Sequence, residues 1–523
     1  MTSNPILMSV LILLIWSLGF SRENLLYTYT WQLKEYRWDR MLDFLKSKKG
    51  QQQLRSPLNI LRVALFFALI TYSTQVFWGL ILLLAFTNLV ALGVALKTHR
   101  LYRPKLTARM GLTLAFILSL EIILFFLFKI EPATLLGLAL IRPILATFAI
   151  QFVGIPFFFY KKYLLHKAAK KRLGFMNLKV IGITGSYGKS STKEFLYQIL
   201  KSKFRVSKTP SHVNVDIGIA QTILNTVSKK DEIFIVEMGA YTPGEIASSC
   251  RVAQPNIGII TGVNEQHLSF FKKIETTIKS KAELFAALPT EGLAIVNMDS
   301  PNARKTLAYS TAKRSVTYST QEGHDLRATE IKQKGNVLHF KVEGVEFKVP
   351  IFGEHYVQNL LACIAASLEL GLTLKEIAKY AQQCQLLEGS FQIFEGKKGC
   401  QIIDDSYNAN PDGFLLALKM AKDIKTKKLI LVTPGMMELG DASESMHKKI
   451  GHSIATSCDS LIVTSEDAYE ALCEASRETK TTLHLATKTA DMISAIEKEL
   501  EPGSLILFEN RVPQVVINHF KKA

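Results

Sequence analysis

One stretch of the chain, Val180 to Glu194 (VIGITGSYGKSSTKE), combines residue types and a spacing that suit the binding of a phosphate group. Its β-prone residues run into a glycine-rich turn, and from Ser190 onward the residues favour a helix. Gly185 and Gly188 would let backbone N–H groups face an anion at the positive end of that helix. Lys189 would reach the β and γ oxygens, and the Ser190 hydroxyl could hold Mg²⁺. The stretch therefore predicts a strand, a phosphate loop and a helix that bind a nucleoside triphosphate.

The loop departs from the strict phosphate-loop pattern, which places a further glycine where this chain has Ile183. Strand, loop and helix nevertheless follow one another in the required order. We therefore interpret the stretch as a phosphate loop rather than a surface turn, and we count Ser186 and Ser191 among its nucleotide-binding residues.

The charge of the chain is unevenly distributed. A length of 523 residues predicts three or four domains. The formal net charge is +18, of which residues 1–178 carry +16 and the remaining residues +2. The basic residues of the first part lie between strongly apolar runs, where they set the orientation of membrane spans. This arrangement predicts a membrane segment and argues against nucleic acid as a partner.

Four apolar runs in the first part predict five membrane spans. The runs are Ile6 to Phe20, Val63 to Leu96, Leu112 to Phe128 and Thr134 to Phe159, and the second is long enough for a hairpin that turns near Ser73 to Gln75. The first run lacks the features of a cleaved signal peptide, so we interpret it as an anchor. The flanking basic residues place the N-terminus outside, and the segments 21–57 and 97–109 and everything after Lys161 in the cytosol.

Glu121 and Arg142 fall inside the predicted spans. Charges in a bilayer are costly, and they usually pair with one another or line a site. Two interpretations stay open: an ion pair between helices, and a role in gripping a lipid-linked substrate.

From Lys179 onward the pattern changes to an α/β protein. Short apolar runs alternate with helical segments, which is typical of parallel sheets flanked by helices. The predicted strands are Val180 to Thr184, Ile233 to Met238, Ile257 to Thr261 and Leu293 to Asn297, then Gln401 to Asp404, Leu429 to Thr433, Ser460 to Val463 and Leu505 to Phe508. Between the two series we expect a small antiparallel insert over Ser315 to Ile351 and a helix over His355 to Leu370, with a domain boundary near Leu387.

The predicted fold is therefore α/β with three parts. Residues 1–173 form an α-helical transmembrane region, 174–387 a parallel-sheet ATPase domain of the phosphate-loop type, and 388–523 a Rossmann-like α/β domain. All six cysteines lie in the last two parts without metal-ligand spacing, and we interpret them as reduced thiols in the cytosol.

Several further motifs follow the phosphate loop in a fixed order. They are NVDIG from Asn214, EMGA from Glu237, TGVNEQHL from Thr261, KSKAELF from Lys279, GEHYVQN from Gly353, DDSYNANP from Asp404, and ELG from Glu438 with His447 beyond it. Taken together they resemble the Mur ligases, most closely the D-alanyl-D-alanine-adding MurF type of peptidoglycan synthesis. The resemblance covers about Lys179 to Ala523 and does not include the membrane part.

The resemblance implies an amide-bond ligase that uses ATP and Mg²⁺. In that family ATP phosphorylates a carboxylate, and an amine then displaces the phosphate. The implied catalytic residues are Lys189, His267 and Lys281. Carried over by motif, the ATP-binding residues are Gly185, Ser186, Gly188, Lys189, Ser190, Ser191, Asn297, Asn359, Asp405 and Tyr407; the Mg²⁺-side residues are Ser190, Glu237, His267 and, if carbamylated, Lys281; and the substrate residues are Asn214, Asn408, Asn410 and Arg511.

The chain departs from the family pattern in the last domain and at the N-terminus. Ser390 follows Gly389 where the family carries an arginine, and of the KGSR-like stretch, here 508–511, only Arg511 is kept. These changes bear on the incoming amine more than on the ATP chemistry. Membrane spans stand where the family has a soluble domain for the uridine nucleotide, so we expect an acceptor that is lipid-linked or handled at the membrane face.

The sequence thus favours a ligase of the cytoplasmic membrane, with its catalytic domains in the cytosol, that adds D-Ala-D-Ala or a related amino acid or dipeptide to a peptide precursor of the cell wall. Three alternatives stay open: a ligase that makes another peptide polymer such as polyglutamate, a transporter or scaffold regulated by a Mur-like ATPase domain, and a degenerate ligase that binds nucleotide without turnover.

Overall fold

The computed structural model describes residues 21–55, 57–71, 77–97, 102–127, 132–264, 273–407, 411–436, 450–476 and 481–522. The chain divides into two units, Met1–Tyr163 and Leu164–Ala523.

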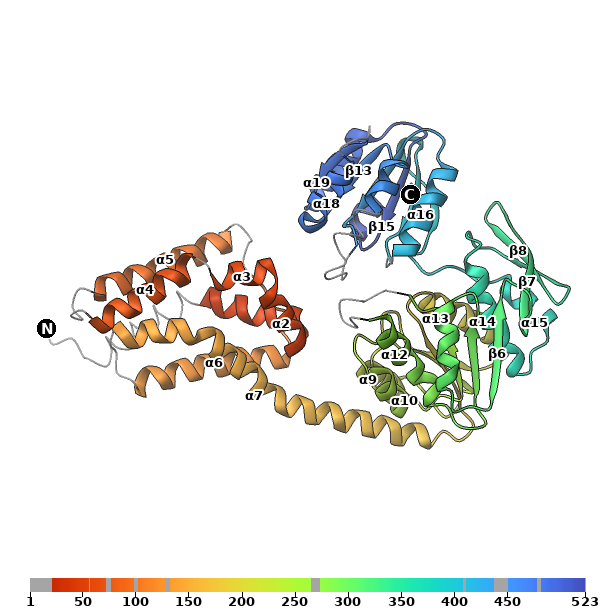
Figure 1. Cartoon of the computed structure of the whole chain (residues 1–523), viewed down its shortest axis with the longest axis horizontal. Helices are drawn as coiled ribbons and strands as arrows, with labels where there is room; N and C mark the ends of the chain where they lie inside the picture. Colours follow the sequence, from red (N-terminus) through yellow and green to blue (C-terminus); the bar gives the residue numbers. More distant parts are fainter. Residues whose placement is uncertain are drawn as a thin grey trace. The chain divides into compact units, whose positions relative to one another are not determined.

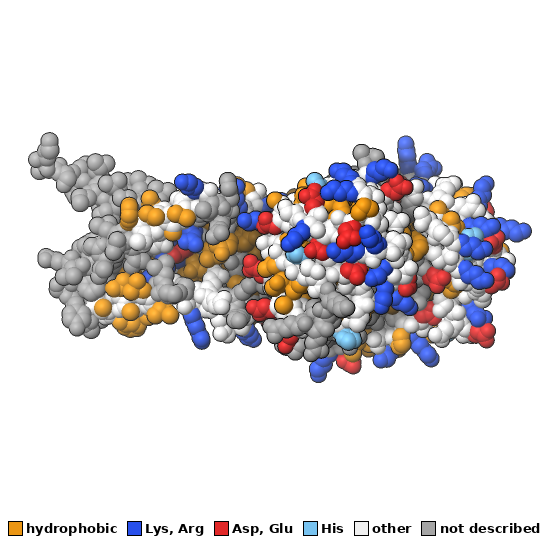
Figure 2. Space-filling view, turned by 90° about the horizontal axis from the view of Figure 1, so that it is seen from above, with side chains coloured by type: hydrophobic (Ala, Val, Ile, Leu, Met, Phe, Trp, Pro, Cys, Tyr) orange, Lys and Arg blue, Asp and Glu red, His pale blue; other side chains and the backbone are white. Residues whose placement is uncertain are grey.

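The first unit is helical. Residues 21–33 form a helix, and α2 (Trp38–Lys46), α3 (Lys48–Leu54), α4 (Pro57–Thr71), α5 (Phe77–Lys97), α6 (Ala108–Leu127) and the start of α7 (Pro132–Leu173) follow. Many large apolar side chains of this unit are exposed, among them Phe67, Phe86, Leu112 and Ile144. Figure 2 shows hydrophobic side chains gathered on the surface of this unit, whereas charges of both signs intermingle on the second unit.

Two described helices, Ala108–Leu127 and Leu135–Leu173, are long and apolar enough to cross a membrane, and Asn59–Ala68 is a shorter apolar helix. This finding rests on length and composition. The predicted first span, Ile6 to Phe20, and the predicted turn near Ser73 to Gln75 lie outside the described residues. The count of five spans therefore stays a prediction.

The two charged residues of the predicted spans meet inside the first unit. Arg142 Nε donates to Glu121 Oε1 at 2.8 Å, and Asn24 Nδ2 donates to the same oxygen at 3.2 Å. Both partners of the ion pair are buried. The geometry thus fits the interpretation of an ion pair that joins α6 to α7.

The central domain carries a nine-stranded sheet in the order β2-β3-β1-β4-β5-β6-β7-β8-β9. The strands are β1 (Lys179–Thr184), β2 (Val206–Lys208), β3 (Ile233–Glu237), β4 (Ile257–Ile260), β5 (Leu293–Asn297), β6 (Arg314–Ser319), β7 (Leu326–Lys334), β8 (Val337–Val342) and β9 (Val345–Val349). Strands β1 to β6 run parallel, so the carboxyl ends of β1, β3 and β4 meet at one edge. The predicted strands of this series are confirmed.

Helices cover both faces of this sheet, because successive side chains of a buried strand point to opposite sides. Ile181 and Ile183 of β1 pack with α8 (Lys189–Leu200), α14 (Tyr356–Glu369) and α15 (Leu374–Ala381). Val180 packs on the other side with α9 (Asp216–Asn225), α10 (Glu245–Ala253) and α12 (Ile274–Ala286). Figure 1 shows this layered arrangement, with α13 (Pro301–Arg304) close to the second group.

The predicted antiparallel insert is correct only in part. β6 pairs in parallel with β5, from Leu293 opposite Arg314 to Asn297 opposite Tyr318, and so extends the main sheet. Only β7, β8 and β9 pair antiparallel. The alternating pattern of β6 reflects its exposed first half rather than an antiparallel partner.

The C-terminal domain has a six-stranded sheet in the order β10-β11-β15-β12-β13-β14. Its strands are β10 (Gln392–Glu395), β11 (Gln401–Asp405), β12 (Leu429–Thr433), β13 (Ser460–Val463), β14 (Thr482–Leu485) and β15 (Leu505–Glu509), and its helices are α16 (Pro411–Ile424), α18 (Glu466–Ser476), α19 (Thr489–Glu499) and α20 (Gln514–Phe520). All neighbours pair in parallel except β10 with β11. The four strands predicted for this domain are all present.

The last turn of α7 belongs to the core of the central domain. Ala168 is fully buried there. The Lys171 ammonium donates to three carbonyls at the end of α9, those of Ile223, Leu224 and Val227, at 2.8 to 3.1 Å. The Arg172 guanidinium donates to the carbonyls of Ala253, Phe175 and Leu178 at 3.1 to 3.2 Å. Cations at helix C-termini are favourable because they meet the negative end of the helix dipole.

Candidate active site

The phosphate loop lies between β1 and α8, as the sequence predicts. Gly188 is the N-cap of α8 and has a φ of 76°, a conformation that favours glycine. A Cβ atom at Gly188 would lie 2.5 Å from Asn359 Oδ1. One at Gly185 would lie 2.1 Å from Thr261 Oγ1. Both glycines are therefore required by close contacts as well as by backbone conformation.

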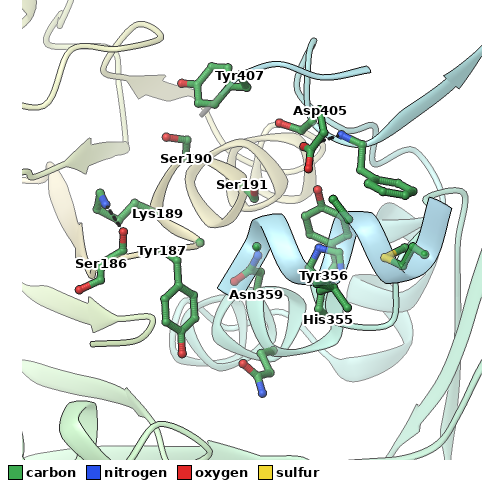
Figure 3. A pocket seen from close by; sticks show the side chains of 18 residues that line it. Ser186, Tyr187, Lys189, Ser190, Ser191, His355, Tyr356, Asn359, Asp405 and Tyr407 are labelled. Atoms are coloured by element: carbon green, nitrogen blue, oxygen red, sulfur yellow. Dashed lines mark hydrogen bonds between the residues drawn. The ribbon is translucent and has the colours of Figure 1, made fainter. Parts of the chain in front are cut away.

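Lys189 is held back against the loop. Its ammonium donates to the carbonyl of Gly185 at 2.7 Å and to that of Ser186 at 3.2 Å, and Figure 3 shows the second of these bonds. Burial lowers its pKa, and the negative charge of Glu237 partly offsets that effect. Phosphate oxygens that entered the loop would replace these carbonyls as acceptors for the ammonium.

Ser190 and Glu237 meet at the carboxyl end of β3. Ser190 Oγ lies 3.0 Å from both carboxylate oxygens of Glu237. Glu237 is buried, and burial raises the pKa of its carboxyl group, but Lys193, Lys189 and the hydrogen bonds it accepts outweigh that effect and lower the pKa overall. A charged carboxylate beside a hydroxyl is an oxygen donor set that suits Mg²⁺.

Lys193 is a residue of this site that the sequence reasoning missed. Its ammonium lies 2.9 Å from Glu237 Oε2, and only 2% of the side chain is exposed. The available signal was its position three residues after Ser190 on a helix, which places both on one face. A buried charge is rarely retained without a partner, and here the partner is Glu237.

A cavity of about 370 Å³ opens beside the phosphate loop. The loop and the start of α14 form one wall, and the C-terminal domain forms the other. Its lining includes the predicted nucleotide residues Ser186, Gly188, Lys189, Ser190, Ser191, Asn359, Asp405 and Tyr407, together with His355, Tyr356, Gln358, Ser390, Phe391 and part of α16. Figure 3 shows side chains from both domains directed toward this space.

Asn297 has a different position from the other predicted nucleotide residues. It is fully buried and donates through Nδ2 to the Thr261 carbonyl at 2.7 Å and to Gln358 Oε1 at 3.1 Å. Gln358 is the residue of this network that lines the cavity. Asn297 thus supports the cavity wall from behind.

A second cavity of about 410 Å³ adjoins the first. It brings together residues from six separate sequence stretches, namely Lys189, Ser190, Asn214, Glu237, Lys281, Tyr407 and Arg511, and adds His212, Gly239, Ala240 and Tyr241. Its lining thus carries three Lys or Arg side chains and one carboxylate. Such a surface suits a substrate that carries negative charge.

Lys281 projects from α12 into this second cavity and is almost fully buried. Burial, with a further contribution from the positive charge of Lys189, lowers its pKa from 10.5 to about 7. A neutral amine is the form of lysine that reacts with CO₂ to give a carbamate. The environment of Lys281 therefore fits the predicted carbamylation.

Tyr407 lines both cavities. Its ring stacks on the His212 ring, with centroids 4.8 Å apart and an angle of 19° between the planes. Its backbone N–H donates to the Gly389 carbonyl at 2.7 Å. Tyr407 thus connects the interdomain linker to the loop that carries His212 and Asn214.

Some predicted site residues lie outside the described residues, namely His267, Asn408 and Asn410. Among the residues that the structure describes, no group of three or more His, Cys, Asp or Glu side chains could hold a metal ion. Glu237 and Ser190 supply oxygen donors, and carbamylation of Lys281 would add another at the same cavity. The described residues therefore fit a Mg²⁺ ion that is shared with the phosphates of a nucleotide.

Two family models match the chain: the Mur ligase middle domain over residues 183–367, and the Mur ligase glutamate ligase domain over residues 391–509. The UDP-N-acetylmuramoyl-tripeptide–D-alanyl-D-alanine ligase of Bacillus subtilis (strain 168) is 30% identical over 350 residues, which cover 66% of this chain and 76% of that protein. The protein of the same name from Escherichia coli (strain K12) is 28% identical, with 52% of this chain and 61% of that protein covered.

Solved structures of MurF proteins share the architecture. A crystal structure of MurF from Acinetobacter baumannii superposes with a TM-score of 0.62 and 26% identity, over 69% of this chain and 80% of that one. The MurF ligase of Thermotoga maritima in complex with ADP gives a TM-score of 0.58 and 27% identity, over 68% and 81%.

The chain combines a phosphate-loop domain with a second α/β domain, and the two line one cavity, an architecture that it shares with ATP-dependent ligases. The chain belongs to the Mur ligase family, whose members form amide bonds at the expense of ATP.

Proposed function

We propose that this ligase joins a dipeptide of the D-Ala-D-Ala type, or a related amino acid, to the peptide of a cell-wall precursor. The observation that carries the proposal is the meeting of the two cavities at Lys189, Ser190 and Tyr407. A nucleotide in the first cavity would point its terminal phosphate into the second. The similar ligases of B. subtilis and E. coli are named for UDP-N-acetylmuramoyl-tripeptide and D-alanyl-D-alanine, which supports this choice of substrates.

The reaction needs charge compensation and positioning rather than a protein nucleophile. A carboxylate oxygen of the acceptor attacks the γ-phosphorus of ATP, the bond to the β–γ bridging oxygen breaks, and ADP leaves. The incoming amine then attacks the acyl carbon, loses a proton, and expels inorganic phosphate as the amide forms. Lys189 would move from the carbonyls of Gly185 and Ser186 to the phosphate oxygens. Backbone N–H groups of the loop and the start of α8 would hold the β-phosphate.

Mg²⁺ bound by Ser190 and Glu237 would neutralise charge on the phosphates. Lys281, once carbamylated, would present a carboxylate-like group to the same side of the cavity. Asn214 and Arg511 line the second cavity, and in this proposal they bind the acceptor or the amine donor. The Arg511 guanidinium suits a carboxylate, which a dipeptide donor retains at its far end.

We propose further that the ligase is held at the cytoplasmic membrane by its N-terminal helices. Two described helices have the length and apolar composition of membrane spans. In α7 the exposed aromatic side chains Phe158, Phe159 and Tyr160 are followed directly by exposed Lys161 and Lys162. Aromatic and basic side chains in this order are typical of the boundary between lipid and cytosol. A lipid-linked acceptor would suit this placement.

The test is phosphate release by the detergent-solubilised full chain with ATP and Mg²⁺, in which D-Ala-D-Ala and a tripeptide acceptor are added or withheld. The acceptor is supplied in UDP-linked and in lipid-linked form. We expect release that needs both substrates, a product heavier by the mass of the dipeptide less water, and no activity in Lys189→Ala. Release that needs neither substrate but is lost in Lys189→Ala would refute the ligase and favour an ATPase that regulates another process. Equal rates with both acceptor forms would refute the preference for a lipid-linked acceptor.

A further inference from the structure

We propose that Lys193 is a positioning residue that keeps Glu237 from holding a divalent cation until the nucleotide is bound. The inference rests on the proposed role of Glu237 as a metal ligand beside the triphosphate. It adds that the nucleotide binds before the metal ion, and it assigns the control of this order to Lys193, which lines neither cavity.

The contacts of Lys193 account for its position. The side chain extends from α8, and its ammonium contacts Glu237 Oε2 at 2.9 Å and the Pro210 carbonyl at 3.3 Å. Only 2% of the Lys193 side chain and 3% of the Glu237 side chain are exposed. Water therefore screens this ion pair little, and its charges act strongly on any ion that enters the cavity.

Lys193 also holds the loop that contributes His212 and Asn214 to the wall of the second cavity. The Pro210 carbonyl belongs to the segment that leads to His212 and Asn214. Next to it, Thr209 Oγ1 accepts the backbone N–H of Glu237 at 3.1 Å. One ammonium thus joins the helix of the phosphate loop, the end of β3 and the wall of the substrate cavity, so the Glu237 carboxylate has a fixed orientation.

The charge balance gives the order of binding. Without nucleotide, the single negative charge of Glu237 is flanked by two positive charges, those of Lys193 and Lys189. A divalent cation near Glu237 would then meet a net positive environment, which disfavours its binding. A nucleoside triphosphate brings several negative charges to the loop, and the balance reverses. Because Lys193 engages Oε2, the other oxygen would serve the metal, together with Ser190.

The experiment measures Mn²⁺ binding to the full chain in detergent by the loss of the free-ion EPR signal, with no acceptor or amine present. Wild-type protein should bind Mn²⁺ weakly alone and at least about tenfold more tightly with a non-hydrolysable ATP analogue. Lys193→Met keeps the length of the side chain and removes its charge. We expect it to bind Mn²⁺ without nucleotide at least about tenfold more tightly than wild type.

The matched control is Lys208→Met, which removes a cation that pairs with Glu194 on the same helix α8. Its Mn²⁺ binding should equal that of wild type. The double variant Lys193→Met with Glu237→Gln removes both charges of the Lys193–Glu237 ion pair, and we expect it to lose the gain in Mn²⁺ affinity. This variant also shows whether the gain acts through Glu237.

Unchanged or weaker nucleotide-independent Mn²⁺ binding in Lys193→Met would overturn the proposal. Equal Mn²⁺ affinity of wild type with and without the analogue would also overturn it, and that measurement does not depend on the folding of any variant. The assay contains neither acceptor nor amine, so it can fail while the ligase reaction is confirmed. It can also succeed while the proposed substrates are wrong.

Discussion

Asp405 and Glu509 are register partners on the adjacent parallel strands β11 and β15, and their carboxyl groups interact directly beside the nucleotide cavity. Burial raises the pKa of Asp405 to about 6. Burial and the negative charge of Asp405 raise the pKa of Glu509 well above its ordinary value. The folded chain therefore disfavours ionisation of this buried pair, most strongly at Glu509.

The Asp405–Glu509 pair predicts that the stability of the protein falls as the pH rises. We expect Glu509→Gln to weaken this pH dependence. Below about pH 3 both carboxyls are protonated in the folded and in the unfolded chain, and the pair has no unfavourable effect on stability. As the pH rises, the unfolded carboxyls ionise first, so stability is lost up to and beyond about pH 6. The side-chain amide that Glu509→Gln introduces can still donate a hydrogen bond but carries no charge. Between pH 5 and pH 8 the melting temperature of wild type should fall by several degrees more than that of the variant. Parallel plots of melting temperature against pH would contradict the interaction between the two carboxyls.

Lys281 should react with CO₂ in a pH-dependent way. Its pKa of about 7 means that the neutral amine predominates above that pH, whereas the ammonium, which cannot form a carbamate, predominates below it. With ¹³C-bicarbonate at pH 8 we expect a carbamate carbon resonance that fades as the pH falls through 7 and is absent in Lys281→Met. The same variant should lose about 10²-fold or more in ligase rate. A resonance that persists in the variant would assign the carbamate to another amine.

Gly188→Ala should abolish nucleotide binding through a contact rather than through backbone strain alone. The new Cβ would lie 2.5 Å from Asn359 Oδ1, at a φ of 76°. Gly244→Ala is the matched control, since its φ is 90° and its Cβ would meet nothing within 4 Å. Both substitutions carry the roughly 1–2 kcal/mol cost of a left-handed alanine. Titration with a fluorescent ADP should show a loss of more than about tenfold for Gly188→Ala only; equal losses would point to strain.

The Glu121–Arg142 pair should be a structural feature of the helical unit. Breaking a buried pair by removing one partner typically costs about 3–5 kcal/mol, whereas replacing both partners is close to neutral. In detergent, Glu121→Gln and Arg142→Met should each lower the melting temperature, and the double variant should recover most of the loss. Ligase activity per folded molecule should match wild type in the double variant. If it falls sharply while stability recovers, the pair contacts the substrate after all.

The sequence predicted the buried strands well because they are continuous apolar runs. β1, β3, β4 and β5 are hydrogen-bonded on both sides within the main sheet and buried on both faces, so their pattern is unambiguous. β2, β10 and β14 were missed, and all three are short, half-exposed strands at the edges of sheets. Their burial pattern gives no periodic signal, and they form only because a neighbouring strand supplies hydrogen-bond partners.

The residues of the site likewise fall into those that the sequence predicted and those that it did not. Lys189, Ser190 and Glu237 were predictable because each belongs to a short motif at the carboxyl end of a strand. Lys193 and His212 were not, because a buried ion pair and a stacked ring depend on residues from distant segments. Asn297 was predicted to bind ATP, yet it lies behind Gln358, a position that follows from the packing of α14 on the sheet.

The bonds of Lys171 and Arg172 also determine where the catalytic part of the chain can be separated from the rest. A soluble fragment that begins at Gly174, just after α7, would lack both cations, leave the last carbonyls of α9 and α10 without these donors, and expose the core around Phe175. A fragment that begins at Leu164 keeps them. Residues 164–173 of α7 therefore belong to the fold of the catalytic part, and a truncated enzyme has to retain them.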